Sequence, residues 1–195
     1  MKQTLPLFLV DDDAAILDSL TFMLRQFGYS LQPFSCGLTF LDQVNLTLPG
    51  CVILDSRMPV LTGQEIQQRL LDADSPLGII FLTGHGDLPM AVNAFRQGAC
   101  DFFQKPVSGK ALAEAIEKSM LHSQQAYEST QLRLNLTKLS ERERQVLHLL
   151  VQGKTNKQIS EALFLSLRTI EVHRSNVMKK LQVHNMAELA KYSHI

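Results

Sequence analysis

The chain has 195 residues, of which 45% are hydrophobic and 19% charged, a composition typical of globular proteins with one or two domains. No apolar run approaches the roughly 18 residues of a membrane span, and three widely spaced cysteines do not indicate a disulfide framework, so we expect a cytoplasmic protein with no membrane partner. The net charge of zero conceals an acidic first part (8 Lys and Arg against 13 Asp and Glu in residues 1–120, a net −5) and a basic second part (11 against 6 in residues 121–195, a net +5), which suggests a polyanionic partner for the second.

Short apolar runs alternate with helix-period stretches over the first 120 residues. Runs without polar alternation are typical of strands that are buried on both faces. We predict strands at residues 5–10, 29–34, 51–54, 79–82 and 101–103, and helices at 16–27, 37–45, 64–72, 88–97 and from 109 onward. Five alternations of strand and helix predict an α/β domain in which helices cover both faces of a parallel sheet.

The pattern becomes entirely helical after residue 109. It loses its apolar stripe over residues 122–135, which we interpret as either a polar helix or a linker. Beyond Leu139, capping-box spacings at Ser140 and Thr155 and an N-cap at Ser166 predict three helices. Their core positions include Val146, Leu147, Leu149, Leu150, Ile159, Ala162, Leu163, Ile170, Val177 and Leu181. The short turn between the second and third helices is typical of a helix-turn-helix.

Polar residues of different chemical types follow four of the predicted strands. Asp11–Asp13 follow the first strand, Asp55 the third, Thr83 the fourth and Lys105 the fifth. Because ligands bind beyond the carboxyl ends of parallel strands, we expect these side chains at one edge of the sheet. Clustered carboxylates favour a hard cation such as Mg²⁺, and an aspartate in such a place can act as a nucleophile towards phosphorus.

The motifs VDDD, ILDSRMP, LTGH and KP resemble the receiver domain of two-component response regulators, over about residues 5–122. The resemblance implies a doubly wound five-stranded sheet with strand order 2-1-3-4-5. It also implies that a sensor histidine kinase phosphorylates Asp55. Mg²⁺ would be bound directly by Asp12, Asp55 and the main-chain carbonyl of Arg57, with Asp11 in support.

The same resemblance implies roles for three residues around the phosphoryl group. Thr83 and Lys105 would contact it, and the rotamer of Phe102 would follow Thr83; as a residue by itself, Phe102 could equally be ordinary core. Asp13 is at least as well explained as the N-cap of the helix that follows it. We interpret His85 as a solvated or hydrogen-bonding loop side chain rather than a catalytic one.

The third helix of the second part carries many polar and basic residues. Those expected on its outer side are Arg168, Thr169, Glu171, His173, Arg174, Ser175, Asn176, Lys179 and Lys180. Such groups can hold phosphates and read base edges in a major groove. The alternative is a three-helix bundle with a solvated polar face.

The segments LSERERQVL, GKTNKQIS and LSLRTIEVHRSNVMKKL resemble the LuxR-type helix-turn-helix over residues 137–192, so the whole chain is similar to NarL/FixJ-family regulators. The resemblance implies a four-helix unit that binds double-stranded promoter DNA, with the last helix (Met186, Leu189, Ala190) assisting dimerisation. The residues nearest the bases would be Glu171, Val172 and Ser175. Those holding the DNA backbone would be Asn156, Lys157, Thr169, Arg174 and Lys179. An acid at position 171 would accept from a cytosine amine or brace a neighbouring arginine.

These features predict a receiver domain at residues 1–122, a helical or flexible linker at 123–136 and a DNA-binding domain at 137–195. We expect phosphorylation to bias the region 88–107 and so to switch homodimerisation or to unmask the basic domain. One alternative is an orphan regulator that binds DNA without phosphorylation. The other is an aspartate-nucleophile phosphatase of the haloacid dehalogenase type, whose DxD signature is missing because Arg57 stands two residues after Asp55.

Overall fold

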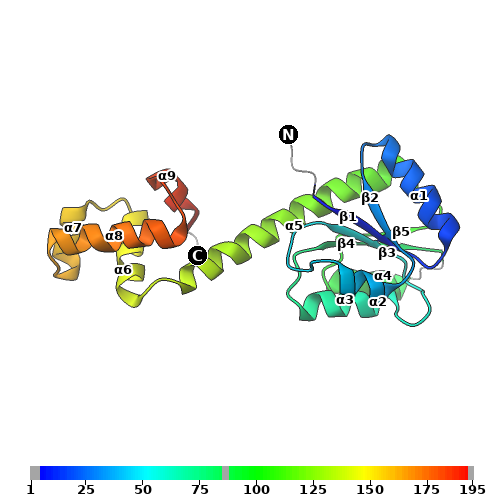
Figure 1. Ribbon diagram of the computed structural model, residues 1–195, viewed down its shortest axis with the longest axis horizontal. Coiled ribbons are helices and arrows are strands. Elements are labelled where there is room, and N and C mark those ends of the chain that lie inside the picture. The colour runs from blue at the N-terminus through cyan, green and yellow to red at the C-terminus, as the bar shows by residue number, and fades with distance from the viewer. Residues whose placement is uncertain (1–4, 85–87, 193–195) are drawn as a thin grey trace. The chain divides into compact units, whose positions relative to one another are not determined.

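The computed structural model describes residues 5–84 and 88–192. The chain divides into two compact units, residues 1–127 and 128–195, and each is described by itself (Figure 1). Among the described residues, no helix combines the length and the apolar character needed to cross a bilayer.

A five-stranded parallel sheet forms the centre of the first unit. Its strands are β1 (Leu7–Val10), β2 (Leu31–Phe34), β3 (Cys51–Leu54), β4 (Gly78–Thr83) and β5 (Asp101–Gln104). They pair in the order β2-β1-β3-β4-β5, which confirms the expected doubly wound fold. The strands β1, β3 and β4 are buried along their whole length, as their unbroken apolar runs predict. Observed strand ends differ from the predicted ones by no more than two residues.

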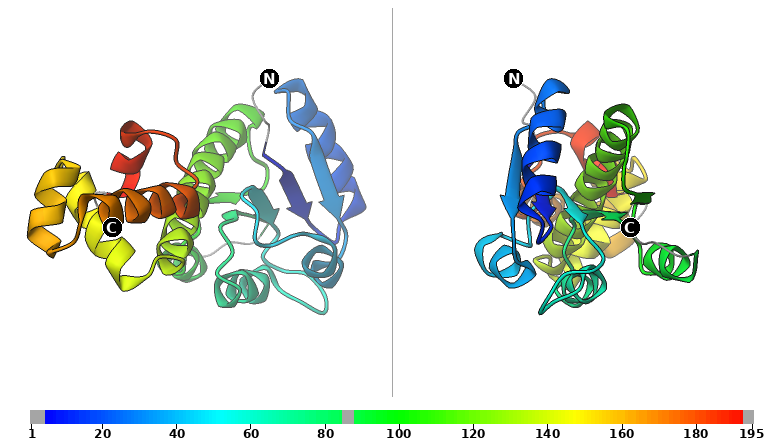
Figure 2. Two further views of the ribbon diagram at one scale, coloured as in Figure 1. Left: turned by 60° about the vertical axis from the view of Figure 1, so that its left-hand side comes forward. Right: turned by 90° about the vertical axis from the view of Figure 1, so that its right-hand side faces the viewer.

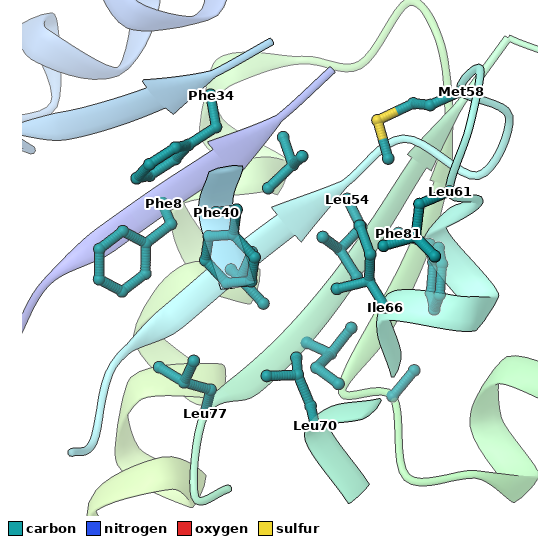
Figure 3. Packing of buried hydrophobic residues seen from close by; sticks show 14 of the residues in the cluster. Phe8, Phe34, Phe40, Leu54, Met58, Leu61, Ile66, Leu70, Leu77 and Phe81 are labelled. Atoms are coloured by element: carbon teal, nitrogen blue, oxygen red, sulfur yellow. The ribbon is translucent and has the colours of Figure 1, made fainter. Parts of the chain in front are cut away.

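Helices cover both faces of this sheet (Figures 1 and 2). On one face lie α1 (Ala14–Gln26) and the first part of α5 (Gly109–Thr137), and on the other lie α2 (Gly37–Gln43), α3 (Gly63–Asp72) and α4 (Leu88–Arg96). We call the buried apolar side chains of these two layers the α1/α5 cluster and the α2–α4 cluster. Figure 3 shows the second of these, with the rings of Phe8, Phe34 and Phe40 grouped at one end and Phe81 packed near Leu61 and Ile66.

Successive residues of each strand alternate between the two clusters, as the pleat requires. In β1, Leu7 and Leu9 belong to the α1/α5 cluster, whereas Phe8 and Val10 belong to the α2–α4 cluster. The other central strands follow the same rule. The alternation decides on which side of the sheet edge each polar residue beyond a strand emerges.

The N-terminus of α1 is capped by Asp13. Its side chain accepts a hydrogen bond from the Ala15 N–H at 2.8 Å, which satisfies one of the unpaired N–H groups of the first turn. The helix ends at Gln26. Gly28 then turns the chain with φ +84°, a left-handed conformation that glycine adopts more easily than other residues. The N-cap interpretation of Asp13 is therefore confirmed.

The sequence left one segment undecided between a polar helix and a linker, and this segment is part of helix α5. Residues 122–135 are helical. Earlier in the helix, Leu112, Ala115 and Ile116 pack in the α1/α5 cluster. Its last turns belong to the second unit, where Leu132 and Leu136 pack on the core of that unit.

The second unit is helical. It contains α6 (Glu141–Val151), α7 (Asn156–Leu163), α8 (Leu167–Leu181), α9 (Met186–Leu189) and a 3₁₀ turn at Ala190–Tyr192. The predicted caps at Ser140, Thr155 and Ser166 are all present, the first two as complete capping boxes. The turn from α7 to α8 begins at Phe164, which has φ +55° and ends α7 in the left-handed conformation. This arrangement is a helix-turn-helix.

Three expectations for this unit need correction. Ala162 is exposed rather than part of the core, because Ile159 and Leu163 already fill the inward face of the short helix α7. Leu189 is fully buried against the core, so of the three C-terminal residues expected to assist dimerisation only Met186 and Ala190 are exposed. Lys180 is not purely solvent-facing, because its Nζ donates to Glu143 Oε2 at 2.6 Å.

The ion pair between Glu143 and Lys180 ties α6 to α8. Glu143 is 4% exposed and also closes the Ser140 capping box by accepting from the Ser140 N–H at 2.7 Å. The hydrogen bond from Lys180 is the main cause that lowers the pKa of Glu143 below its ordinary value of 4.5. A lowered carboxyl pKa means that the unfolded state binds the proton more readily, so the stabilisation is present above about pH 4.5 and is lost as the pH falls through the folded-state pKa.

We expect Glu143→Gln to reduce the free energy of unfolding of the second unit by about 1–2 kcal/mol at pH 7. The value is below that of a fully buried charged hydrogen bond because the Lys180 side chain is 39% exposed. Urea unfolding followed through NMR signals of α6 and α8 would measure it, and the loss should shrink at pH 4. The matched control is Glu65→Gln, followed through NMR signals of α3, which alters the same kind of capping box at an exposed site of the first unit. A loss of stability that is equal for the two substitutions would show that the ion pair contributes nothing.

Candidate functional site

Three charged side chains from separate strand ends meet at the carboxyl edge of the sheet. Asp11 follows β1, Asp55 follows β3 and Lys105 follows β5. Lys105 Nζ lies 2.5 Å from Asp11 Oδ2 and 2.9 Å from Asp55 Oδ1. The residues Asp11 and Asp55 are only 2% and 6% exposed, so two buried carboxylates share one ammonium. The structure therefore brings together three of the residues that the sequence placed at this edge.

Backbone groups hold both carboxylates in place. The Arg57 N–H donates to Asp55 Oδ2 at 2.7 Å, and the Asp13 N–H donates to Asp11 Oδ1 at 3.1 Å. The loop after Asp55 then closes on itself, with the Gly63 N–H donating to the Ser56 carbonyl. A Cβ atom at Gly63 would collide with the Asp55 carbonyl oxygen, so this close approach requires glycine.

The electrostatics of the site are set by burial and by the shared ammonium. Burial raises the pKa of Asp11 and exceeds the lowering by the hydrogen bonds from Lys105 and the Asp13 N–H. Burial alone would lower the pKa of Lys105, but its hydrogen bonds to Asp11 and Asp55 outweigh that effect and the pKa is raised. The two ends of the ion pair thus differ: the ammonium is stabilised, whereas the more deeply buried Asp11 carboxylate is not fully compensated. Two carboxylates face one ammonium, so a negative charge is left at this edge that a further cation can neutralise.

The side chains of the predicted metal ligands differ in exposure. Asp12 is exposed, unlike Asp11 and Asp55. Within residues 5–84 and 88–192, no group of three or more His, Cys, Asp or Glu side chains lies so that it could hold a metal ion. The donor chemistry nevertheless fits a hard divalent cation, because carboxylate and carbonyl oxygens are the ligands that Mg²⁺ prefers and Mg²⁺ needs few of them beside water.

Of the expected switch residues, Thr83 is the last residue of β4 and Phe102 lies in β5. Thr83 is 1% exposed, and its Oγ1 accepts a hydrogen bond from Ser56 Oγ. Phe102 is half-buried, packs against the α2–α4 cluster and lies 6.1 Å from the Phe81 ring between centroids. His85 lies outside the described residues. The bond between Ser56 and Thr83 was missed by sequence reasoning. Strand alternation places Ser56 on the same side as Leu54, but it does not identify Thr83 as the partner.

In the second unit, α8 presents the outward groups of the helix-turn-helix. Glu171, Val172, Ser175 and Lys179 are exposed, with Val172 53% exposed, whereas Thr169, His173 and Arg174 are half-buried. From α7, Lys157 is exposed and Asn156 is half-buried. The Thr169 N–H donates to the Ser166 side chain, which fixes the start of α8.

Two of the expected DNA-contacting residues contact each other. Arg174 donates through a guanidinium nitrogen to Asn156 Oδ1 at 3.0 Å, which joins α8 to the start of α7. An amide that accepts from a guanidinium orients it without neutralising its charge. Sequence reasoning assigned both residues to DNA but could not pair them, because they are 18 positions apart on different helices.

Comparisons with known proteins agree with both units. The family model described as "Response regulator receiver domain" matches residues 7–117, and the model described as "Bacterial regulatory proteins, luxR family" matches residues 137–193. The chain is 42% identical over 181 residues to the tetrathionate response regulatory protein TtrR of Salmonella typhimurium, covering 93% of this chain and 88% of TtrR. It is 40% identical over 189 residues to the transcriptional regulatory protein FixJ of Bradyrhizobium diazoefficiens, covering 95% of this chain and 92% of FixJ.

A solved structure extends the similarity over the same length. The response regulator StyR matches with a TM-score of 0.72 and 38% identity, covering 96% of this chain and 97% of that one. Family membership also sets aside the phosphatase alternative, since these relatives are regulators rather than turnover enzymes. The chain belongs to the NarL/FixJ family of two-component response regulators, with a receiver domain and a LuxR-type DNA-binding domain.

Proposed function

We propose that a partner histidine kinase phosphorylates Asp55, and that the phosphorylated chain dimerises and binds promoter DNA in the cytoplasm to control transcription. The observation that carries the proposal is the meeting of two buried carboxylates on the ammonium of Lys105. Phosphoryl transfer needs chiefly a positioned nucleophile and neutralised charge. The sheet edge offers both, since Asp55 is held by backbone and a cation lies beside it.

The chemical step follows from the atoms at the site. A carboxylate oxygen of Asp55 forms the new O–P bond while the N–P bond of the kinase's phosphohistidine breaks, and that electron pair remains on the imidazole nitrogen. The phosphoryl oxygens then carry the negative charge, and we assign Thr83 Oγ1 and Lys105 Nζ as donors to them. Lys105 and the Arg57 N–H already contact the two carboxylate oxygens at 2.9 and 2.7 Å, so both donors are available to a phosphoryl group formed there.

We propose that the metal bound at this edge is Mg²⁺, because its donors would be carboxylate and carbonyl oxygens. Asp12, Asp55 and the Arg57 main-chain carbonyl would hold it directly, and Asp11 would support it. When bound, the cation would neutralise charge on the phosphoryl oxygens. The incomplete compensation of the Asp11 carboxylate supports this assignment, because a second positive charge would stabilise its ionised form.

The region 88–107 is suited to transmit the change. Ala94 is the only fully buried residue among the described residues of α4, whereas Leu88, Val92 and Phe95 are 76%, 37% and 48% exposed. A helix with so little buried surface can shift at low cost. Its apolar side chains form a surface that a second receiver would bury, so we assign the homodimer contact to this helix and the adjoining β5.

The helix-turn-helix supports promoter binding by the second unit. We assign the residues nearest the bases as Glu171, Val172 and Ser175, all of them exposed on α8. Backbone contacts are assigned to Lys157, Thr169, Arg174 and Lys179, with Asn156 beside Arg174. Glu171 would accept from a cytosine amine.

We expect Arg174→Ala to weaken DNA binding equally for a promoter duplex and an unrelated duplex. It should also reduce the slope of log Kd against log salt concentration by about 1, because one fewer phosphate is neutralised. Fluorescence anisotropy at several salt concentrations measures both quantities. Asn156→Ala should weaken binding by about threefold but keep the slope, since the amide only orients the guanidinium.

Lys191→Ala provides the matched control for this test. Lys191 is exposed on the 3₁₀ turn, away from the assigned contact residues in sequence, and its removal should leave the slope unchanged. If Arg174→Ala leaves the slope at its wild-type value, Arg174 does not contact phosphate.

The experiment that tests the proposed function is phosphodonor treatment of the full chain. Acetyl phosphate with Mg²⁺ should add one phosphoryl group, which mass spectrometry should locate in the peptide that contains Asp55. The treated chain should also sediment as a dimer and bind promoter DNA more tightly. Modification at another residue would refute the site, and equal DNA binding with and without the donor would favour the orphan alternative.

A further inference from the structure

Two buried hydroxyl groups bond to each other next to the phosphoacceptor. Ser56 Oγ donates to Thr83 Oγ1 at 2.5 Å, and each residue is 1% exposed. Ser56 directly follows Asp55, and Thr83 is the last residue of β4. The bond therefore links the neighbour of the phosphoacceptor to the hydroxyl that the proposed function assigns to the phosphoryl group.

Strand alternation places this pair on the opposite side of the sheet edge from the Asp55 carboxylate. Leu54 and Phe81 lie in the α2–α4 cluster, and Ser56 and Thr83 each follow two residues later, so they emerge on that side. Asp55, one residue from Leu54, emerges on the α1/α5 side, where it meets Lys105. The Thr83 hydroxyl is thus held by Ser56 on the α2–α4 side, opposite to the side on which Asp55 meets Lys105.

We propose that Ser56 is a positioning residue that holds the Thr83 hydroxyl in the conformation of the unphosphorylated receiver. This inference rests on the proposed function, in which Thr83 donates to a phosphoryl group on Asp55. To do so, Thr83 Oγ1 has to leave Ser56 and turn towards the other side of the edge. The Ser56 bond favours the unphosphorylated conformation, and the phosphoryl group has to offset its loss. Ser56 thereby sets how readily the receiver switches.

The direct test is Ser56→Ala in the full chain, titrated with beryllium fluoride in the presence of Mg²⁺ as a non-covalent phosphoryl probe. Without the Ser56 bond, the binding-competent conformation is more populated, so the half-saturating fluoride concentration should fall by about three- to tenfold. The backbone NMR signals of Thr83 and its β4 neighbours report the saturation. Urea unfolding of the same variant shows that the receiver is folded.

If Ser56 acts by positioning Thr83, the effect of Ser56→Ala must depend on the Thr83 hydroxyl. A general loss of stability would not depend on it. In a Thr83→Ala background, Ser56→Ala should change the half-saturating concentration by less than about 1.5-fold, because no hydroxyl remains to be held. In a Thr83→Ser background, which keeps the hydroxyl, the full effect of Ser56→Ala should return. An equal effect in the Thr83→Ala background, no effect in the wild type, or weaker binding by Ser56→Ala would each overturn the inference.

The same titration distinguishes failure of this inference from failure of the proposed function. If the proposed function is wrong, the wild type will not bind beryllium fluoride, or Asp55→Asn will bind it as well as the wild type does, and both proposals fall. If the wild type binds and Asp55→Asn does not, the proposed function stands. The Ser56 and Thr83 variants then decide the inference alone.

Discussion

Asp55→Asn is expected to reduce phosphoryl incorporation from acetyl phosphate to the level of the untreated chain. The amide occupies the same space but is not a nucleophile towards phosphorus, and it has no charge to pair with Lys105. Dimerisation and promoter binding should then no longer respond to the donor. Intact-mass spectrometry measures the first result, and sedimentation and anisotropy measure the other two.

The matched control for this substitution is Asp13→Asn. Asp13 is an exposed carboxylate two residues from Asp11, and its side chain caps α1. Asparagine caps helices about as well as aspartate, so phosphorylation, dimerisation and stability should remain at wild-type values. Undiminished modification of the Asp55→Asn chain would place the acceptor elsewhere. A loss that is equally large in Asp13→Asn would indicate a general effect of acidic charge on the donor reaction.

Much of the receiver fold and its charged edge could be predicted because the signals are local. An unbroken apolar run such as Cys51–Leu54 predicts a central strand, and the residue after a strand in an open parallel sheet lies at the ligand-binding edge. Asp55 and Lys105 could therefore be placed at one edge without coordinates. Capping residues such as Ser140 are equally local, because the cap and its N3 partner are three positions apart.

Other features could not be predicted because they depend on which side chains meet across elements. The bond from Ser56 to Thr83 joins two strands, and the contact between Asn156 and Arg174 joins two helices. Neither pair has a fixed sequence spacing. Asp11 is buried against Lys105, 94 positions away in sequence, so its difference from the exposed Asp12 was not predicted either. Sequence pattern thus finds the residues of a site more readily than their partners.

Lys105→Met should destabilise the receiver by about 2–4 kcal/mol at pH 7 in the presence of EDTA. The substitution preserves much of the side-chain length but leaves the buried carboxylates of Asp11 and Asp55 without the ammonium that both contact. Because the Lys105 side chain is 20% exposed, we expect a smaller loss of unfolding free energy than for a fully buried ion pair. Native-state hydrogen exchange of the β1 and β3 amides measures the free energy of unfolding of this domain alone.

The pH and metal dependence of this variant test the charge argument separately from packing. Burial already raises the pKa of Asp11, and removing Lys105 should raise it further. A raised carboxyl pKa means that the folded state binds the proton more readily, so the lost stability should be regained as the pH falls from 7 through the folded-state pKa towards the ordinary value of 3.8. Millimolar Mg²⁺ should restore stability at pH 7, because a divalent cation at the carboxylates replaces the missing charge.

Lys110→Met, which removes an exposed cation from the first turn of α5, should show neither dependence. If Lys105→Met is equally stable in EDTA and Mg²⁺ and at both ends of this pH range, the two carboxylates are not the groups that this edge has to neutralise.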